Sequence, residues 1–150
     1  MMIFHFRLLS DESEDFLLDV EVPYDMNLLD FQKFLSKTLS YNPCEIASFF
    51  TSDSEWEKLR EFTLIDMGVD SSEFDPETDD DEMASPVAME KVTLGQIMHK
   101  KFDRLIYVFD MFAERGLFIQ LLHSKKADET TKYPRVVEFK GIAPVQITNE

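Results

Sequence analysis

Cysteine is nearly absent from this sequence, and Cys44 is its only cysteine residue. A single thiol cannot form a disulfide within the chain. A catalytic role for Cys44 would require a nearby base to generate the thiolate, and sequence order alone does not place one. The N-terminus also lacks the basic start, long apolar run and small-residue cleavage site of a secretory signal. We therefore expect a protein of the reducing cytoplasm.

Long apolar runs and the motifs of common enzymes are missing as well. No run approaches the roughly 18 to 20 apolar residues of a membrane-spanning helix, so we expect no membrane association. The absence of a G-x-S-x-G elbow, a P-loop and a dinucleotide fingerprint excludes the commonest hydrolase, nucleotide-binding and oxidoreductase classes. The sequence accordingly predicts no catalytic residue and no cofactor, and it favours a protein that is not an enzyme.

Cations are scarce relative to acids. Fifteen Lys and Arg residues stand against 30 Asp and Glu residues, which gives a formal net charge of −15. This charge disfavours direct nucleic-acid binding, because it repels the phosphate backbone. Residues Asp70 to Glu82 hold eight carboxylates and no Lys or Arg. Like charges without apolar periodicity are typical of a solvated loop, so we expect a mobile acidic insertion at 69–86 within a single domain, 1–150.

The remaining sequence has the periodicity of a folded domain. Apolar residues alternate with polar ones over 3–9 and 16–22, which predicts two strands joined as a hairpin and ended by Pro23. Asn27 precedes apolar residues at helical spacing and is typical of a helix N-cap. The helix is expected to stop at Asn42-Pro43, since proline disfavours helical geometry in the residue before it.

The middle and the second half of the chain predict shorter elements. We expect a strand at 46–51, a polar loop at 52–56, a helical turn through Lys58 and Leu59, and a short strand at 62–64. A second helix is expected from Thr93 to about Lys101. Strands at 104–112 and 117–123 should form a second hairpin, and 136–139 should be the final strand, which Gly141 and the residues after it carry away from the sheet edge.

This order of elements predicts an α+β fold, with helices on one face of a largely antiparallel mixed sheet. The opening hairpin, helix and strand resemble a β-grasp arrangement. That arrangement hosts many unrelated functions, so it carries almost no functional information.

Several short segments resemble one known family. They are Phe4-His5-Phe6-Arg7-Leu8, Asn27-Leu28-Leu29-Asp30-Phe31, Ser52-Asp53-Ser54-Glu55-Trp56, Tyr107-Val108-Phe109-Asp110 and Gly141-Ile142-Ala143-Pro144. Together, across most of the chain, they are similar to the plasmid pRiA4b ORF-3-like proteins, some of which are described as transposon-passenger proteins of the TnpR type. The resemblance implies a fold and an association with mobile elements, but no reaction.

The sequence departs from this family after Asp110. Many relatives continue with Phe-Gly-Asp and then Trp and His, a polar and aromatic cluster that could form a site. Here the chain places Arg115 at the Trp position and Leu117 at the His position. For this chain, the resemblance therefore implies no activity that depends on that histidine.

Metal binding is the first candidate chemistry, and the pattern favours it weakly. Asp75, Glu77, Asp79 and Asp81 alternate in the acidic segment, and carboxylate oxygens are the ligands of Ca²⁺. The segment lacks the sixth-position Gly and twelfth-position Glu of an EF-hand loop. The histidines lie far apart in the sequence, without the short spacings of zinc sites. We therefore assign no metal ligand.

Partner binding is the better-supported hypothesis. Trp56 stands among acidic residues where a strand meets a loop, and it either anchors a partner or packs against the core edge. Asp110, Glu114 and Arg115 surround the second hairpin turn, where they form either a small polar site or a surface ion pair. The candidate partner-binding residues are Asp53, Trp56, Asp75, Asp79, Asp80, Asp81, Asp110, Glu114 and Arg115.

Three functions remain open at this point. The leading one is a non-enzymatic interaction module that binds a basic protein partner through its acidic surface. The second is a metal-assisted enzyme that uses clustered carboxylates, with a concave site near Asp53 and Asp110. The third is a nucleic-acid mimic that occupies a DNA-binding protein. The sequence leaves the identity of the partner and the oligomeric state open.

Overall fold

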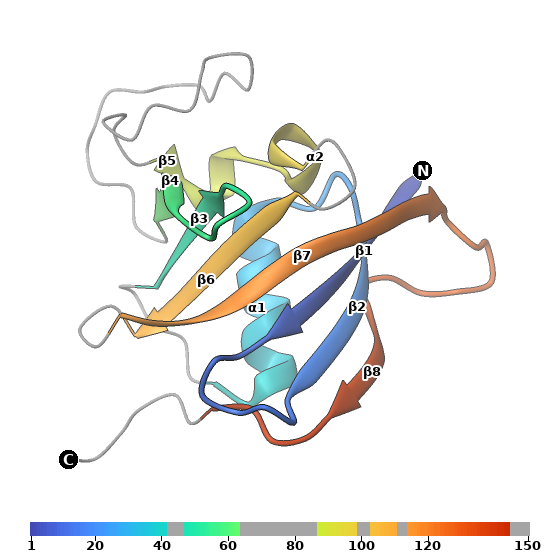
Figure 1. The fold of residues 1–150 in the computed structure, drawn as a ribbon. Coiled ribbons are helices and arrows are strands. Elements are labelled where there is room, and N and C mark those ends of the chain that lie inside the picture. Colours follow the sequence, from blue (N-terminus) through green and yellow to red (C-terminus); the bar gives the residue numbers. More distant parts are fainter. Residues whose placement is uncertain (42–46, 64–86, 99–102, 111–113, 145–150) are drawn as a thin grey trace.

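The computed structural model describes residues 1–41, 47–63, 87–98, 103–110 and 114–144, and these form a curved sheet with a helix packed across it (Figure 1). The strands are β1 (Met2–Leu9), β2 (Leu17–Pro23), β3 (Ser48–Ser52), β4 (Lys58–Thr63), β5 (Val87–Ala88), β6 (Arg104–Asp110), β7 (Arg115–Lys126) and β8 (Arg135–Lys140). The helices are α1 (Leu28–Leu39), the 3-10 helix η1 (Met89–Lys91) and α2 (Leu94–Ile97).

All the described strands belong to one mixed sheet, in the order β5-β4-β3-β6-β7-β1-β2-β8. Every neighbouring pair is antiparallel except β4 and β5, which are parallel. The predicted α+β class with a largely antiparallel sheet is therefore confirmed. The opening order of hairpin, helix and strand is also present, with β7 and β6 lying between β1 and β3.

The first hairpin forms because both of its strands carry apolar residues at alternate positions. The register pairs Phe4 with Val22, Phe6 with Val20 and Leu8 with Leu18. All six side chains are buried in one cluster with Phe31 and Leu35 of α1, so they lie on the sheet face that this helix covers. The intervening residues point to the opposite face, which we call the outer face.

Helix α1 begins where the sequence predicts. The Asn27 side-chain oxygen accepts a hydrogen bond from the backbone N–H of Asp30 at 2.8 Å, which satisfies one of the free donors of the first turn. The helix ends at Leu39, one residue before Ser40, whose φ of 60° is left-handed. Asn42 and Pro43, the predicted stop, lie outside the described residues.

The core lies between α1 and the sheet. The Phe31 ring is 5.6 Å from the rings of both Phe6 and Phe49, so the helix contacts strands on both sides of β7 and β6. Leu94 and Met89, from α2 and η1, belong to the same buried cluster. Buried apolar residues from both halves of the described chain thus form one core.

The predicted helical turn at Lys58 and Leu59 is wrong, because both residues belong to β4. The Asp53 carboxylate accepts hydrogen bonds from the backbone N–H groups of Glu55 and Glu57, at 2.8 and 3.0 Å. These bonds close a tight turn after β3, and the chain then returns as an antiparallel strand. The expected strand at 62–64 is the end of β4, and residue 64 lies outside the described residues.

The second half of the chain completes the sheet. Strands β6 and β7 form the predicted hairpin, and β7 also pairs with β1, so it joins the two hairpins. Helix α2 is shorter than predicted, because the backbone is already extended at Met98. The final strand pairs with β2. The predicted insertion at 69–86 falls entirely outside the described residues, which resume at Val87.

Candidate functional site

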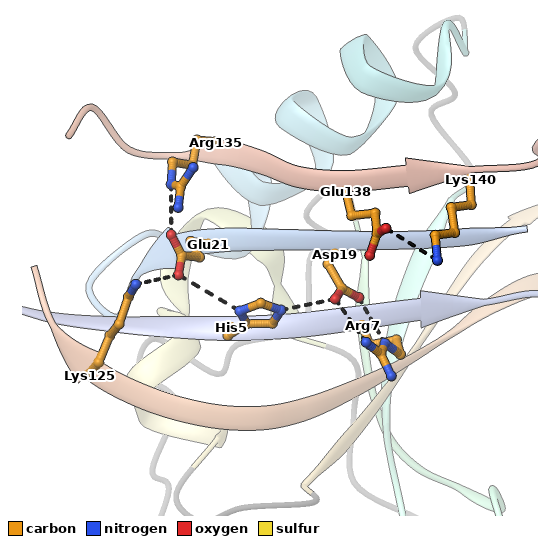
Figure 2. A network of polar contacts seen from close by, with 8 residues as sticks. All are labelled: His5, Arg7, Asp19, Glu21, Lys125, Arg135, Glu138 and Lys140. Carbon is orange, nitrogen blue, oxygen red and sulfur yellow. Dashed lines mark hydrogen bonds and ion pairs between the residues drawn. The ribbon is translucent and has the colours of Figure 1, made fainter.

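Two acidic side chains lie buried on the outer face of the sheet, at its β2 strand. Asp19 and Glu21 are only 4% and 3% exposed. They alternate with Leu18, Val20 and Val22 in β2, so the strand that contributes to the core also presents two carboxylates to the outer face. Figure 2 shows them among side chains from β1, β2, β7 and β8. The ionic network, as we name it, consists of His5, Arg7, Asp19, Glu21, Lys125 and Arg135.

Asp19 is held by two residues of β1. The Arg7 guanidinium donates Nε–H to Asp19 Oδ1 at 2.9 Å and Nη2–H to Oδ2 at 3.0 Å, which is a bidentate pair. His5 Nε2 lies 3.2 Å from Asp19 Oδ2. Burial by itself would raise the pKa of Asp19, but the two hydrogen bonds from Arg7, together with the nearby His5 ring, outweigh it and hold the pKa below its ordinary value. Asp19 is therefore ionised at neutral pH.

Glu21 is held from the two strands that flank the hairpin. Arg135 of β8 donates Nε–H to Glu21 Oε1 at 2.7 Å, and the Lys125 ammonium of β7 lies 2.6 Å from Oε2. Burial again opposes ionisation, but the bonds from Lys125 and Arg135 prevail and lower the pKa of Glu21. Glu21 thus ties together segments that are far apart in the sequence.

His5 stands between the two carboxylates. Its Nδ1 lies 3.8 Å from Glu21 Oε2, on the side of the ring opposite Asp19 (Figure 2). The β1–β7 pairing places His5 opposite His123, with ring centroids 4.7 Å apart. The sequence shows these histidines far apart, and only the pairing of β1 with β7 brings them together. Among the described residues, no group of three or more His, Cys, Asp or Glu is arranged to hold a metal ion.

The geometry of the ionic network limits its chemistry. Every oxygen of Asp19 and Glu21 faces an Arg or Lys side chain of the protein, so neither carboxylate is free to ligate a metal or to act as a general base. The side chains of Arg7, Lys125 and Arg135 are 38%, 44% and 41% exposed. The network therefore presents cationic groups to solvent and keeps its carboxylates beneath them.

The predicted partner-binding residues Asp53 and Trp56 lie in the turn between β3 and β4. Asp53 closes the turn, as described above. Trp56 has a φ of 65°, and its ring contacts Phe118 edge-on at 5.1 Å and lies beneath the Arg104 guanidinium at 4.7 Å. Arg104 also donates a hydrogen bond to the Ser54 carbonyl. Trp56 is thus fixed against residues of β6 and β7 while remaining partly exposed.

The structure brings two of the three residues predicted around the second hairpin turn into direct contact. Arg115 Nη1 lies 3.3 Å from Asp110 Oδ2, and the same guanidinium contacts both Glu12 oxygens at 2.8 and 3.0 Å. Glu12 belongs to the turn of the first hairpin, so Arg115 bridges the two hairpin turns. Glu114 is exposed and has a left-handed φ of 54°.

Asp53 and Asp110, which were expected to lie near one concave site, are at opposite ends of β6. Asp53 follows Ser52, which pairs with Arg104 at the beginning of β6, whereas Asp110 is the last residue of that strand. At about 3.3 Å per residue, the length of β6 separates them by roughly 20 Å. The acidic candidates Asp75, Asp79, Asp80 and Asp81 lie outside the described residues.

Sequence reasoning missed the ionic network, although one signal was available. The alternation that predicts β2 from its apolar residues also places Asp19 and Glu21 together on the other face. The hairpin register then puts His5 and Arg7 opposite them. Lys125 and Arg135 carry no such local signal, because they reach Glu21 through strand pairings that the sequence does not specify.

No helix within the described ranges is both long enough and apolar enough to span a bilayer.

Comparison with known proteins identifies a family and a similar solved structure. The family described as plasmid pRiA4b ORF-3-like protein matches residues 7–146. No curated protein matches. A crystal structure of a protein of unknown function from Methanosarcina mazei Go1 is similar, with a TM-score of 0.65 and 14% identity over 92% of this chain and 69% of that chain. At this identity, the similarity shows the fold alone.

Proposed function

Since this chain belongs to the plasmid pRiA4b ORF-3-like family, whose description states no reaction, we propose that it is a non-enzymatic protein-interaction module that binds a basic protein partner. The observation that carries the proposal is the net charge of −15. An acidic surface attracts a basic partner over long distances and speeds the encounter more than it strengthens the complex.

Among the described residues, several acids are already neutralised by ion pairs of the fold. Asp19 and Glu21 are neutralised within the ionic network, and Glu12 and Asp110 share Arg115. The eight carboxylates between Asp70 and Glu82 have no Lys or Arg within their own segment. They are therefore the best candidates for recognition of a basic surface. The single cysteine agrees with a cytoplasmic location, which we include in the proposal.

The first experiment compares the intact protein with two variants in affinity capture from a native-host lysate. One variant lacks residues 70–82, and the other keeps their length but carries Asn and Gln in place of the eight acids. We expect one stoichiometric, basic partner that resists nuclease, is lost from both variants and weakens from low to moderate salt. Equal capture by the neutral variant would show that the charge of this segment does not drive binding. An empty capture with the intact protein would overturn the proposal.

A second form of the proposal is that the acidic surface mimics nucleic acid and occupies a DNA-binding protein. The family description, which refers to a plasmid, favours this form. Under it, the captured partner should bind DNA by itself, and the intact protein should displace the DNA in a competition assay. A partner that binds DNA and this chain at the same time would contradict the mimic.

A further inference from the structure

Strand β8 forms one border of the sheet and has apolar side chains exposed. It pairs with β2, and among the described strands nothing lies on its other side (Figure 1). Val136, Val137 and Phe139 are 38%, 41% and 42% exposed. An edge strand presents unpaired backbone N–H and C=O groups that can pair with another extended chain.

The two faces of this edge differ in chemistry. Val136 pairs with Val20 and Phe139 with Leu18, so both lie toward the face that α1 covers. Arg135 pairs with Glu21 and Lys140 with Leu17, so both lie toward the outer face. Their side chains are 41% and 62% exposed, and Glu138 lies between them, 3.3 Å from Lys140. The edge is therefore apolar on one face and mainly cationic on the other.

Charge argues against a second copy of this chain as the occupant. Antiparallel pairing of two identical β8 strands would bring their Arg135 and Lys140 side chains close together, which places like charges opposite each other. Charged side chains on an edge are a common protection against such self-pairing. They favour instead a strand with acidic residues on the corresponding face.

Strand β2 shows which sequence fits against β8. Its residues Leu18 to Val22 alternate apolar and acidic side chains. The apolar ones lie beside Val136 and Phe139, and Glu21 accepts a hydrogen bond from Arg135 at 2.7 Å. Arg135 uses only Nε in this bond, which leaves its two Nη groups for a further acceptor. A strand of the same alternating pattern would meet similar groups on the outer side of β8.

We propose that the free edge of β8 binds an extended segment of a partner protein in which apolar and acidic residues alternate. Its backbone would extend the sheet, its apolar side chains would cover Val136 and Phe139, and its carboxylates would contact Arg135 and Lys140. This surface and this partner differ from those of the proposed function, which uses acidic residues to bind a basic protein.

The test measures binding of a fluorescent peptide to the full-length protein by anisotropy. The probe copies residues 16–23 of this chain, which contain the alternating pattern. One control peptide carries Lys in place of both acids. The other carries N-methyl groups on alternate backbone amides. We expect saturable binding of the probe, and a loss of at least about tenfold in affinity for each control, because one removes the charge match and the other removes backbone donors.

Variants assign the binding to β8. Lys140→Glu should weaken probe binding by about fivefold at low salt without affecting folding, since this side chain is 62% exposed. Lys126→Glu makes the same charge change on β7 and should leave binding unchanged. Phe139→Asp tests the apolar face, with Leu9→Asp as a control of equal exposure, 42%.

Three results would overturn the inference. They are no binding of the probe, binding that tolerates backbone methylation, and binding that Lys140→Glu leaves intact. Dimerisation that Phe139→Asp abolishes in sedimentation would instead identify a second copy as the occupant. Deletion of residues 70–82 should abolish capture of the basic partner but should not weaken binding of the probe. The two proposals can therefore fail independently of each other.

Discussion

At the scale of single residues, Asp19 and Glu21 show how a sheet tolerates buried charge. An unpaired buried carboxylate is strongly destabilising, but here each has cationic partners on both oxygens. Those partners come from β1, β7 and β8, so each ion pair also fixes the position of a neighbouring strand. Glu21 in particular connects β7 and β8, two strands that do not pair with each other, through its ion pairs with Lys125 and Arg135.

The lowered pKa values of these two carboxyls make stability depend on pH. A group whose pKa is lower in the folded state contributes stability above its unfolded pKa and loses it as the pH falls through the folded pKa. The ordinary values are 3.8 for Asp19 and 4.5 for Glu21. The free energy of unfolding, measured by urea titration, should therefore decrease as the pH falls below about 4.5.

Glu21→Gln should reduce the free energy of unfolding at pH 7 by about 1–3 kcal/mol. The cost stays below that of breaking a fully buried pair, because water can reach Lys125 and Arg135. The variant should lose less stability than the natural protein on acidification, since it lacks one of the two groups responsible. Glu138→Gln, which removes an exposed pair with Lys140, is the control and should cost about 0–1 kcal/mol. Equal effects of both variants at pH 7 would contradict a special role of Glu21.

At the scale of elements, the end of β8 is set by one glycine. Gly141 has a φ of +72°, and a Cβ at this position would collide with the backbone carbonyl of Asp15. This left-handed residue turns the chain away from the sheet, and Tyr41 Oη then donates a hydrogen bond to the Pro144 carbonyl at 2.6 Å. Residues 141–144 thereby return toward the end of α1.

Gly141→Ala should destabilise the protein by about 1–3 kcal/mol, because it combines a strained backbone with a steric clash. Thermal unfolding followed by circular dichroism measures the effect. Ile142→Ala is the matched control, because the neighbouring side chain is 80% exposed and its truncation should change little. A stable Gly141→Ala protein would show that the chain leaves the sheet by another route.

At the scale of the whole molecule, the net charge of −15 opposes compaction. Repulsion among surface carboxylates is stronger in the folded state, where the charges lie closer together. Salt screens it, since the Debye length falls from about 30 Å at 0.01 M to about 8 Å at 0.15 M.

Thermal stability should therefore increase with salt. Between 0.01 and 0.15 M NaCl we expect the unfolding midpoint to rise by about 2–4 °C, which corresponds to about 1 kcal/mol. The variant lacking residues 70–82 should respond less, because it has lost eight carboxylates. A midpoint that falls with salt would show that attractive pairs such as Arg7 with Asp19 outweigh the repulsion.

The sequence predicted those elements that depend on side chains close together in the chain. Alternation at Phe4, Phe6 and Leu8 predicted β1, and Asn27 predicted the start of α1 because an N-cap acts within three residues. The loop after β3 was predicted, but the hydrogen bonds that Glu55 and Glu57 donate to Asp53 leave no periodic trace, so the antiparallel return of the chain was not. Lys58 and Leu59 were then assigned to a helical turn rather than to β4.

The sequence by itself determined the α+β class, the two hairpins, the capped helix and the acidic character of this protein, because side-chain alternation, capping and charge are local or additive properties. The tertiary structure decided which strands are neighbours. It placed His123 beside His5, and it brought Arg135 to Glu21, 114 positions earlier in the chain. Local sequence is compatible with several strand orders. The packing of all strands and α1 around one common core selects the observed order, and these contacts depend on it. Both the ionic network and the free edge of β8 follow from that order.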